Sequence, residues 1–363
     1  MAERTTADTT HVARTSVTLR DVAHASGVSV TTVSRILNGR ESGVPIRDET
    51  RQRVIRTAEE LGYRPNLLAR GLRGSRSTLL GVIARDITDP FHIQILKGIN
   101  GAALSRGYRL FLGNVDYRSE EALAYGSMFE RSHADGIILI GDIKGGEAAD
   151  AEIARHHQNL VGVTDRTERR PFPGVYADSE AGTLLALEHL WELGHRAIMC
   201  VSDVRTADGR LRIDVYERFM RERGAVDGIQ VQVTDQETDL AYELGQRIFA
   251  RPADPAASTA IYAASDTTAI GLMQAAHQAG IVIPRDLSIV GFDDIDVAPF
   301  TIPPLTTISQ EGIAMGEAAV ELLLDMVEGG KDRAEVEDRV LMPRLVRRGS
   351  TEAPGSVAAA LAS

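Results

Sequence analysis

Side chains suited to reading DNA bases occur together between residues 29 and 36. In the stretch SVTTVSRI, the residues off the apolar side of a helical repeat are Val30, Thr31, Thr32, Ser34 and Arg35. The forked guanidinium of Arg35 can donate two hydrogen bonds to O6 and N7 of one guanine, and a threonine methyl can pack on the methyl of thymine. A solvated helix surface is the alternative for any one of these residues, so their role depends on the elements that position them.

Two short helices joined by a glycine turn are predicted around these residues. Thr18 is a good N-cap for the first helix, and Gly27 can adopt the left-handed conformation that ends it. Ser29 can cap the second helix, in which apolar Val33 and Ile36 recur at helical spacing. This pattern is typical of a helix-turn-helix, whose second helix enters the major groove of DNA.

Two further helices are predicted before the sequence changes character. One covers residues 48–61, and a shorter one follows in PNLLARGLR at 65–73, where Asn66 can act as the cap. An isolated helix this short is marginal in water, so we expect the segment to fold only on DNA. Leu72 can then wedge between base pairs in the minor groove. A simple linker is the alternative.

The charge of the chain is divided unevenly. Residues 1–76 contain 13 Arg, no Lys and 8 acidic residues, a net charge of +5, whereas the remaining 287 residues carry −16 of the total of −11. A basic N-terminal region on an acidic body concentrates the attraction for DNA at one end.

The sequence also predicts a cytoplasmic protein. Cys200 is the only cysteine, so no disulfide can form within the chain. Residues 1–17 are polar and rich in threonine, unlike a signal peptide. No apolar run approaches the roughly 20 residues of a membrane span.

From residue 77 onward, strands and helices alternate. Apolar strand-like runs at 78–87, 108–116, 134–142 and 160–166 are separated by helix-like segments. The alternation restarts at GVYADSE and continues to a last strand near 339–342. Unbroken apolar strands between helices favour parallel sheets covered on both faces. Two such sheets side by side leave a cleft at the carboxyl ends of their strands, where ligands of open α/β sheets bind.

Polar side chains follow several of these strands and predict a ligand pocket. Carboxylates and a forked guanidinium suit vicinal hydroxyls, because each can accept or donate two hydrogen bonds in one plane, and an aromatic ring can stack on a sugar or base. The candidates are Asp89, Phe91, His92, Asp165, Arg212, Ser265 and Asp293. The alternatives are a turn cap for Asp293, a surface ion pair for Arg212 and an exposed helix start for His92.

Some conspicuous residues are expected to be structural. Trp191 should pack, His195 and Arg196 should close a helix C-terminus, and Asp178 should support the start of the second unit. The sequence has no GxGxxG, Walker loop, HExxH or GxSxG motif, which argues against an enzyme, and we expect no metal or cofactor.

The motifs together resemble the lactose-repressor (LacI/GalR) family of bacterial regulators, from about Thr18 to Arg348. The matching segments are TLRDVAHASGVSVTTVSRILNG, ETRQRVIRTAEELGYRPN, LLARGLR, DSEAGTLLALEHLWELGHR, SDTTAIGLMQAAHQAGIVIPRDLSIVGFDD and PPLTTISQ. The resemblance implies a homodimer, base reading by Val30, Thr31 and Arg35, and intercalation by Leu72. The sequence departs from the family in a longer loop, GRESGVPI, and in Arg47 where a capping serine is common.

The resemblance extends the two sets of candidate residues. The predicted DNA contacts are Thr18, Ser29, Val30, Thr31, Thr32, Ser34, Arg35, Asn38, Asn66, Ala69 and Leu72. Asp165, Arg212, Ser265 and Asp293 match positions that contact the effector in the family, and Gln236 stands where other members have an aromatic residue. The predicted effector contacts are therefore Asp89, Phe91, His92, Asp165, Arg212, Gln236, Ser265 and Asp293.

These observations predict a helix-turn-helix head followed by an α/β core like that of type I periplasmic binding proteins, with two parallel-sheet subdomains. The expected divisions are a disordered tail at 1–17, a DNA-binding domain at 18–64, a hinge at 65–76, a core at 77–349 and a tail at 350–363. Within the core, we expect one subdomain at 77–165 plus 295–328 and another at 166–294 plus 329–349. The predicted function is a repressor that binds a pseudo-palindromic operator under control of a small effector. A solute-binding protein without a role on DNA, and a sugar-metabolising enzyme, are the alternatives.

Overall fold

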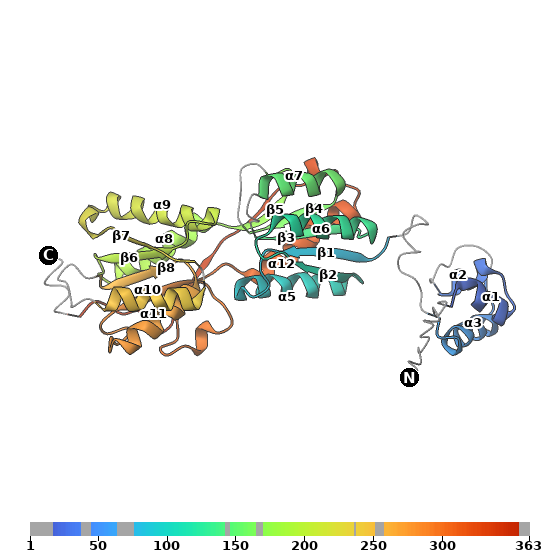
Figure 1. Ribbon diagram of the computed structural model, residues 1–363, viewed down its shortest axis with the longest axis horizontal. Coiled ribbons are helices and arrows are strands. Elements are labelled where there is room, and N and C mark those ends of the chain that lie inside the picture. The colour runs from blue at the N-terminus through green and yellow to red at the C-terminus, as the bar shows by residue number, and fades with distance from the viewer. Residues whose placement is uncertain are drawn as a thin grey trace, which may run out of the picture. The chain divides into compact units, whose positions relative to one another are not determined.

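The computed structural model describes residues 17–37, 45–63, 76–141, 146–164, 170–235, 237–250 and 258–355. The chain forms two compact units, Met1–Ser75 and Arg76–Ser363 (Figure 1). We call them the head and the body.

The described residues of the head form three helices around a small core. Its helices are α1 (Leu19–Ser26), α2 (Val30–Leu37) and α3 (Asp48–Glu60). Val22, Val33 and Val54, one from each helix, are fully buried against one another. The predicted third helix is confirmed, although Arg47 at its N-cap makes no side-chain capping bond.

Local capping accounts for the start and end of α1. The Thr18 amide donates to Oδ2 of Asp21 at 2.7 Å, and the Asp21 amide donates to Oγ1 of Thr18 at 3.4 Å, which is a capping box. Gly27 ends the helix in the left-handed region with φ 67°. This conformation strains any side chain with a Cβ, so the glycine turn between α1 and α2 is required by the backbone.

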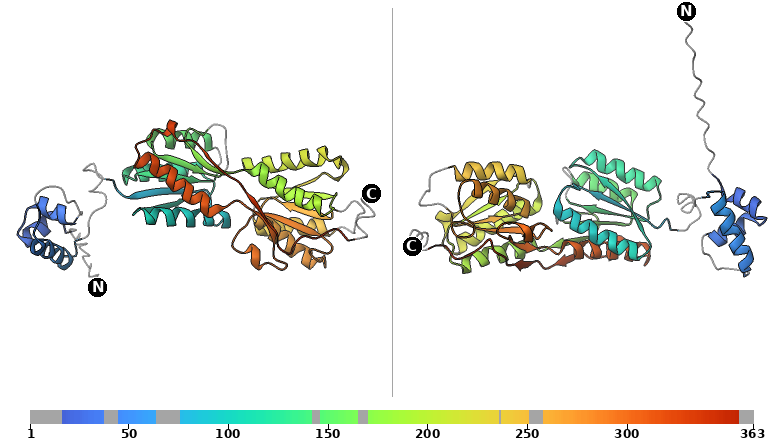
Figure 2. Two further views of the ribbon diagram at one scale, coloured as in Figure 1. Left: turned by 180° about the vertical axis from the view of Figure 1, so that it is seen from behind. Right: turned by 90° about the horizontal axis from the view of Figure 1, so that it is seen from below.

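The body contains two six-stranded sheets, each between layers of helices (Figures 1 and 2). The first sheet has the order β11-β5-β4-β3-β1-β2 and the second β12-β10-β9-β8-β6-β7. The first contains β1 (Leu79–Ala84), β2 (Arg109–Asn114), β3 (Gly136–Ile140), β4 (Leu160–Val163), β5 (Gly174–Ala177) and β11 (Arg339–Leu341). The second contains β6 (Ile198–Ser202), β7 (Gln230–Val233), β8 (Ala260–Ala263), β9 (Ser288–Asp293), β10 (Thr306–Ser309) and β12 (Arg344–Val346). All the recorded pairings are parallel except that of β10 with β12.

The helices of the body are divided between the same two subdomains. The first subdomain has α5 (Pro90–Ser105), α6 (Ser119–Arg131), α7 (Gly146–His156) and α12 (Gly312–Val327). The second has α8 (Ser179–Glu192), α9 (Ala207–Glu222), α10 (Thr238–Phe249) and α11 (Asp266–Gln278). Short 3-10 turns occur at Val226–Gly228, Ala298–Phe300 and Arg333–Glu335. No helix in these ranges is long and apolar enough to cross a membrane.

The predicted limits of the subdomains were wrong in three places. Strand β5 pairs with β4 in the first sheet, although we placed it in the second subdomain. Strand β10 pairs with β9 in the second sheet, and β11 pairs with β5 in the first. The chain therefore changes subdomain after β5, after β10 and after β11. Sheet membership depends on pairing between distant segments, which a local pattern of alternating strands does not encode.

The predicted tail at 350–363 was wrong for its first part. Ser350 is fully buried, and its hydroxyl donates to the carbonyl oxygen of Ile289 at 2.6 Å. The same hydroxyl accepts from the Thr306 amide at 2.8 Å. Residues from 350 to at least 352 thus complete the second subdomain. The predicted tail at 1–17, apart from Val17, and the predicted hinge, apart from Arg76, lie outside the described residues.

Candidate functional site

Helix α2 buries its apolar face in the core of the head and leaves the predicted DNA-contacting residues partly or fully accessible, although Val30 also packs against that core. Val33 and Ile36 are buried, as their spacing predicted, whereas Thr31 is exposed. The other candidates on this helix are half-buried: Val30, Thr32, Ser34 and Arg35. The helix therefore offers a mixed hydroxyl, methyl and guanidinium surface suited to base edges.

Several of the predicted DNA-contacting hydroxyls also fix the starts of helices. The Thr18 hydroxyl donates to Oδ2 of Asp21 at 2.8 Å. The Ser29 hydroxyl lies 2.8 Å from Oγ1 of Thr32 and accepts from the Thr32 amide at 3.1 Å. These hydrogen bonds explain the presence of a hydroxyl at Thr18, Ser29 and Thr32 without any contact to DNA. The DNA contacts of these residues therefore stay a prediction. The other candidates, Asn38, Asn66, Ala69 and Leu72, lie outside the described residues.

A pocket lies between the two subdomains of the body, where their strands end. It is lined by Arg85, Asp89, Phe91, His92, Thr164, Thr206, Asp208, Arg212, Asp293 and Gln310. The cavity measures about 30 Å³, which is room for about two water molecules. Because the lining comes from both subdomains, the width of this space depends on the angle between them.

The first subdomain contributes the start of α5 to this pocket. Asp89 caps the helix by accepting from the Phe91 amide at 2.9 Å. His92 is 1% exposed, so the alternative of an exposed helix start was wrong. Its Nδ1 lies 2.8 Å from the carbonyl oxygen of Asp86 and must donate to it, which leaves Nε2 facing the guanidinium of Arg85 at 3.4 Å. The histidine therefore has a fixed orientation at the pocket wall.

The second subdomain contributes Arg212, which is 3% exposed. Its Nη1 donates to the Ala264 carbonyl oxygen at 2.6 Å, and its Nη2 donates to the Ser179 hydroxyl at 3.3 Å. The carboxylate of Asp208 is 4.0 Å from Nη2. The alternative of a surface ion pair was therefore wrong. Among the described residues, its Nε has no hydrogen-bond partner, and a buried donor of this kind favours a ligand that can accept from it.

Asp293 is held in the pocket by an unusual backbone conformation. Its φ is 115°, a region that residues with a side chain rarely adopt. Gln310, in the segment where the chain returns to the first subdomain, donates from Nε2 to Oδ1 of Asp293 at 2.6 Å. Burial raises the pKa of Asp293 well above its ordinary value, although Arg212 opposes the shift.

The structure brings together five of the eight predicted effector contacts. These are Asp89, Phe91, His92, Arg212 and Asp293. Ser265 is not part of this lining: it is buried at the N-cap of α11, where its hydroxyl accepts from the Thr268 amide at 3.2 Å. Its place after a strand is explained by helix capping. Asp165 and Gln236 lie outside the described residues.

Five lining residues were missed by the sequence reasoning: Arg85, Thr164, Thr206, Asp208 and Gln310. Arg85 and Thr164 directly follow β1 and β4, so the strand-end criterion that found Asp293 would have found them. Thr206 caps α9 and accepts from the Gly209 amide at 3.0 Å, which places Thr206 and Asp208 at the start of this helix. No local signal marks Gln310, which lies in a connection between subdomains.

The residues expected to be structural have structural contacts. Trp191 packs edge-on against Phe219 with ring centroids 5.8 Å apart. Asp178 caps α8 by accepting from the Ala181 amide at 2.9 Å. Arg196 donates to the Trp191 carbonyl oxygen at 2.9 Å, close to the end of that helix. In the described ranges, no three His, Cys, Asp or Glu residues are grouped as metal ligands.

Comparison with known proteins gives matches in both units. Residues 18–66 match the family described as bacterial regulatory proteins, lacI family, and residues 187–351 match a periplasmic binding protein-like domain. The transcriptional regulator DegA of Bacillus subtilis (strain 168) is 34% identical over 337 residues, which are 92% of this chain and 98% of DegA. The transcriptional repressor CytR of Escherichia coli (strain K12) is 31% identical over 341 residues, which are 93% of this chain and 97% of CytR.

A solved structure has a similar fold over most of the chain. The lac repressor dimer bound to operator and the anti-inducer ONPF matches with a TM-score of 0.81 and 27% identity, over 93% of this chain and all of the repressor chain (100%). These relatives are transcription regulators, which supports the prediction of a regulator over that of an enzyme.

Proposed function

The chain belongs to the lacI family of bacterial regulatory proteins, and from this premise we propose that a small polyhydroxy metabolite in the cleft controls its affinity for operator DNA. The observation that carries this proposal is the pocket between the subdomains, with the buried and incompletely satisfied guanidinium of Arg212 in its wall. A ligand oxygen that accepts from Nε would satisfy this donor.

The chemistry of the lining supports a sugar or a related metabolite. The pocket offers three carboxyl groups, two guanidiniums, two threonine hydroxyls and an amide, from both subdomains. Such a set can donate to and accept from several hydroxyls of one ligand, and the apolar wall formed by Phe91 suits a ring face. Because the groups come from both subdomains, a bound ligand would fix the angle between them.

Control of DNA binding follows by linkage. An effector that prefers one angle between the subdomains stabilises that arrangement, and operator DNA prefers one arrangement of the two heads in a homodimer. The coupling free energy in such systems is about 1–3 kcal/mol and acts equally in both directions. In our proposal, paired hinge segments carry the change, and Leu72 enters the minor groove only when they fold.

The operator is expected to be a pseudo-palindrome read by two copies of α2. In each half-site, Val30, Thr31 and Arg35 contact base edges in the major groove. A regulator of chromosomal DNA acts in the cytoplasm, where the lone buried Cys200 stays reduced.

A thermal-shift panel of sugars, sugar phosphates and nucleosides tests the proposed pocket. A ligand at 100 times its Kd adds about 2.7 kcal/mol to the stability of the body, a shift of a few degrees. We expect at least one hit that is lost in both Arg212→Ala and Asp293→Ala. A hit that is kept in both variants would place the ligand elsewhere, and the proposed pocket would be wrong.

A further inference from the structure

Arg76, the first residue of the body, is hydrogen-bonded to the end of α12. Nη2 of Arg76 donates to the carbonyl oxygens of Val327 at 3.0 Å and of Glu328 at 3.4 Å. Nη1 of Arg76 also lies 3.8 Å from Oε1 of Glu328. The last carbonyls of a helix have no partner within it, and a cation there is favoured by the helix dipole. Arg76 therefore caps α12 from outside the helix.

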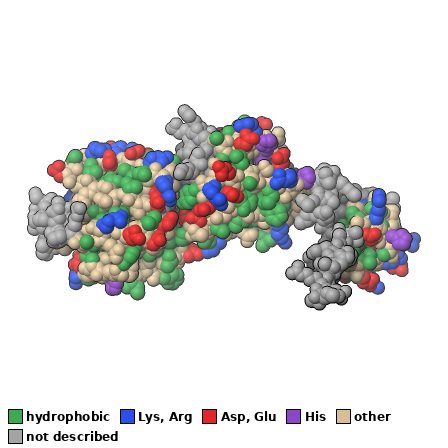
Figure 3. Space-filling model, in the orientation of Figure 1, with side chains coloured by type: hydrophobic (Ala, Val, Ile, Leu, Met, Phe, Trp, Pro, Cys, Tyr) green, Lys and Arg blue, Asp and Glu red, His purple; other side chains and the backbone are tan. Residues whose placement is uncertain are grey.

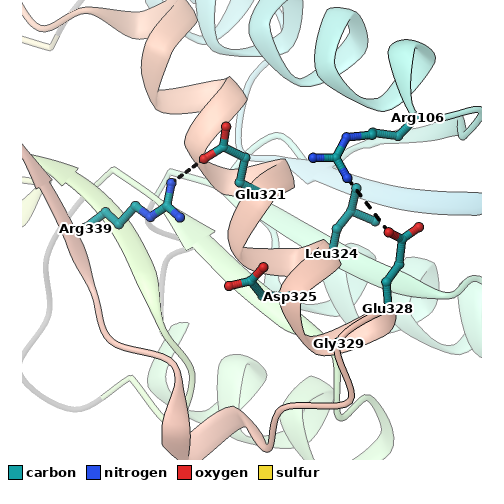
Figure 4. A pocket seen from close by; sticks show the side chains of 7 residues that line it. All are labelled: Arg106, Glu321, Leu324, Asp325, Glu328, Gly329 and Arg339. Atoms are coloured by element: carbon teal, nitrogen blue, oxygen red, sulfur yellow. Dashed lines mark hydrogen bonds and ion pairs between the residues drawn. The ribbon is translucent and has the colours of Figure 1, made fainter.

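Glu328 connects the same point to the end of α5. The Tyr108 hydroxyl donates to Oε1 of Glu328 at 3.2 Å, and Nη1 of Arg106 lies 3.8 Å from Oε2 (Figure 4). Arg106 and Tyr108 directly follow α5. Burial and the neighbouring Glu328 raise the pKa of Tyr108 to about 12, so the tyrosine keeps its proton and donates to the carboxylate at neutral pH. We call Arg76, Arg106, Tyr108 and Glu328 the anchor.

The opposite ends of the two helices lie at the effector pocket. Phe91 and His92, in the first turn of α5, line the pocket. Helix α12 begins at Gly312, two residues after Gln310, which donates to Asp293. Each helix has 16 residues, a length of about 24 Å at 1.5 Å per residue. The pair thus runs from the pocket to the anchor.

The two helices are in backbone contact and cannot slide past one another freely. A Cβ on Gly98 would overlap the carbonyl oxygen of Ile313, and a Cβ on Gly316 would overlap that of Ile95. Close-packed interiors change between discrete arrangements and do not deform continuously. The two helices run side by side in the body (Figure 2). A displacement at the start of either helix is therefore passed along the pair as a rigid unit.

We propose that Arg76 is a positioning residue that couples the α5–α12 pair to the segment leading to the head, an inference that rests on the proposed function. Residues 64–75 join the two units in the sequence, and Arg76 is where this segment enters the body. The ion pair itself is half-exposed, with 50% and 37% of the two side chains accessible, so it contributes little to folding stability. Arg76 and Glu328 therefore suit a contact that couples moving parts of the protein better than one that stabilises the fold.

Hydrogen exchange with and without operator DNA tests the coupling and needs no effector. The probe is the duplex that the wild-type protein selects from a random library, and the readout is amide exchange in peptides covering the starts of α5 and α12. By reciprocity, operator binding must alter the arrangement at the pocket end, and we expect exchange there to change by about fivefold or more. In Arg76→Ala, we expect the head still to contact DNA while the change at the pocket end disappears.

Two further variants separate coupling from a local structural effect. Arg76→Lys keeps a cation at the end of α12 and should restore the change. Lys331→Ala removes another ion pair near the end of α12, in which Nζ lies 2.7 Å from Oδ2 of Asp325, and should behave as wild type. If Arg76→Ala transmits the change as fully as wild type while both bind DNA, the coupling role is wrong and the proposed function stands. If the wild type selects no DNA, the proposed function fails and the inference fails with it.

Discussion

The guanidinium carbon of Arg212 lies 3.7 Å from the centroid of the Phe292 ring. Two of its nitrogen atoms bond to Ala264 and Ser179, and the third, Nε, has no partner in the described part of the chain. Phe292 directly precedes Asp293, so the cation and the buried carboxyl group of the pocket are positioned by the same strand, β9.

Arg212→Lys should abolish or greatly weaken effector binding although it keeps the charge. Lysine cannot stack as a plane or donate in a fork, and hydrogen bonds to charged groups contribute about 1.5–3 kcal/mol each. We expect at least a tenfold rise in the Kd of any ligand found in the thermal-shift panel. Arg210→Ala, an exposed position on the same helix, is the matched control. If Arg212→Lys binds the ligand with wild-type affinity, the forked guanidinium of Arg212 is not used in binding.

Arg205→Ala should shift the body toward an open cleft. The centroid of the Tyr117 ring in the first subdomain lies 5.3 Å from the guanidinium carbon of Arg85 and 5.2 Å from that of Arg205, which belongs to the second subdomain. A half-exposed cation–π contact contributes about 0.5–1 kcal/mol, so its loss should change the ratio of closed to open molecules about two- to fivefold.

Spin-label distances measure this shift directly. Labels on Glu120→Cys and Asp239→Cys report on the two subdomains, because both positions are exposed and the native Cys200 is buried. Arg218→Ala, which removes an ion pair with Glu180 inside the second subdomain, is the control. Identical distance distributions in Arg205→Ala and wild type would exclude a role of this contact in closure.

The sequence predicted best what depends on neighbouring residues. The helix cap at Thr18, the glycine turn at Gly27 and the buried face of α2 follow from local conformational preferences, and the structure has them as expected. Polar residues that follow strands were predicted to line the ligand pocket, and Asp89 and Asp293 do line it.

What failed depends on contacts between distant segments. Strand β5 restarts the alternation of strands and helices in the sequence, yet it pairs in the first sheet through Val163 and Val175. Gln310 reaches Asp293 only because the chain crosses between subdomains there. Ser265 matches an effector position, but its hydroxyl caps α11. A polar residue at the end of a strand is predicted to have its side chain near the cleft. That position does not distinguish a side chain that caps a helix from one that contacts a ligand.

Asp266 should make the stability of the body fall as the pH rises. Burial raises the pKa of this carboxyl to about 7, while hydrogen bonds from Thr307 and the Ile295 amide oppose the shift. The folded state then holds a proton that the unfolded state loses between about pH 4 and 7, so each pH unit in this window costs up to about 1.4 kcal/mol.

Asp266→Asn removes this proton and keeps an acceptor for Thr307. We expect the Tm of the variant relative to wild type to be higher at pH 8 than at pH 5. Asp286→Asn is the control, because hydrogen bonds from Arg285 and the Val282 amide lower the pKa of that exposed carboxyl to about 2, below the window. If the Tm values of Asp266→Asn and of wild type change with pH in parallel, Asp266 is ionised over the whole pH range measured.

Arg35→Ala should relax base specificity at one position of each half-site. A bidentate contact between arginine and guanine contributes about 1–3 kcal/mol of discrimination, whereas loss of a phosphate contact weakens all sequences alike. Binding of the variant to the selected operator and to its single-base substitutions separates these cases. An unchanged preference at every position would exclude base reading by Arg35.

The most direct test of the whole account is the affinity of the full chain for its selected operator, measured by fluorescence anisotropy with and without a saturating ligand from the thermal-shift panel. Effector control predicts a change in Kd of about 5- to 150-fold. The change should disappear in Arg212→Lys, whose ligand-free operator affinity should equal that of wild type. An operator Kd that does not respond to a ligand bound in the cleft would contradict the account.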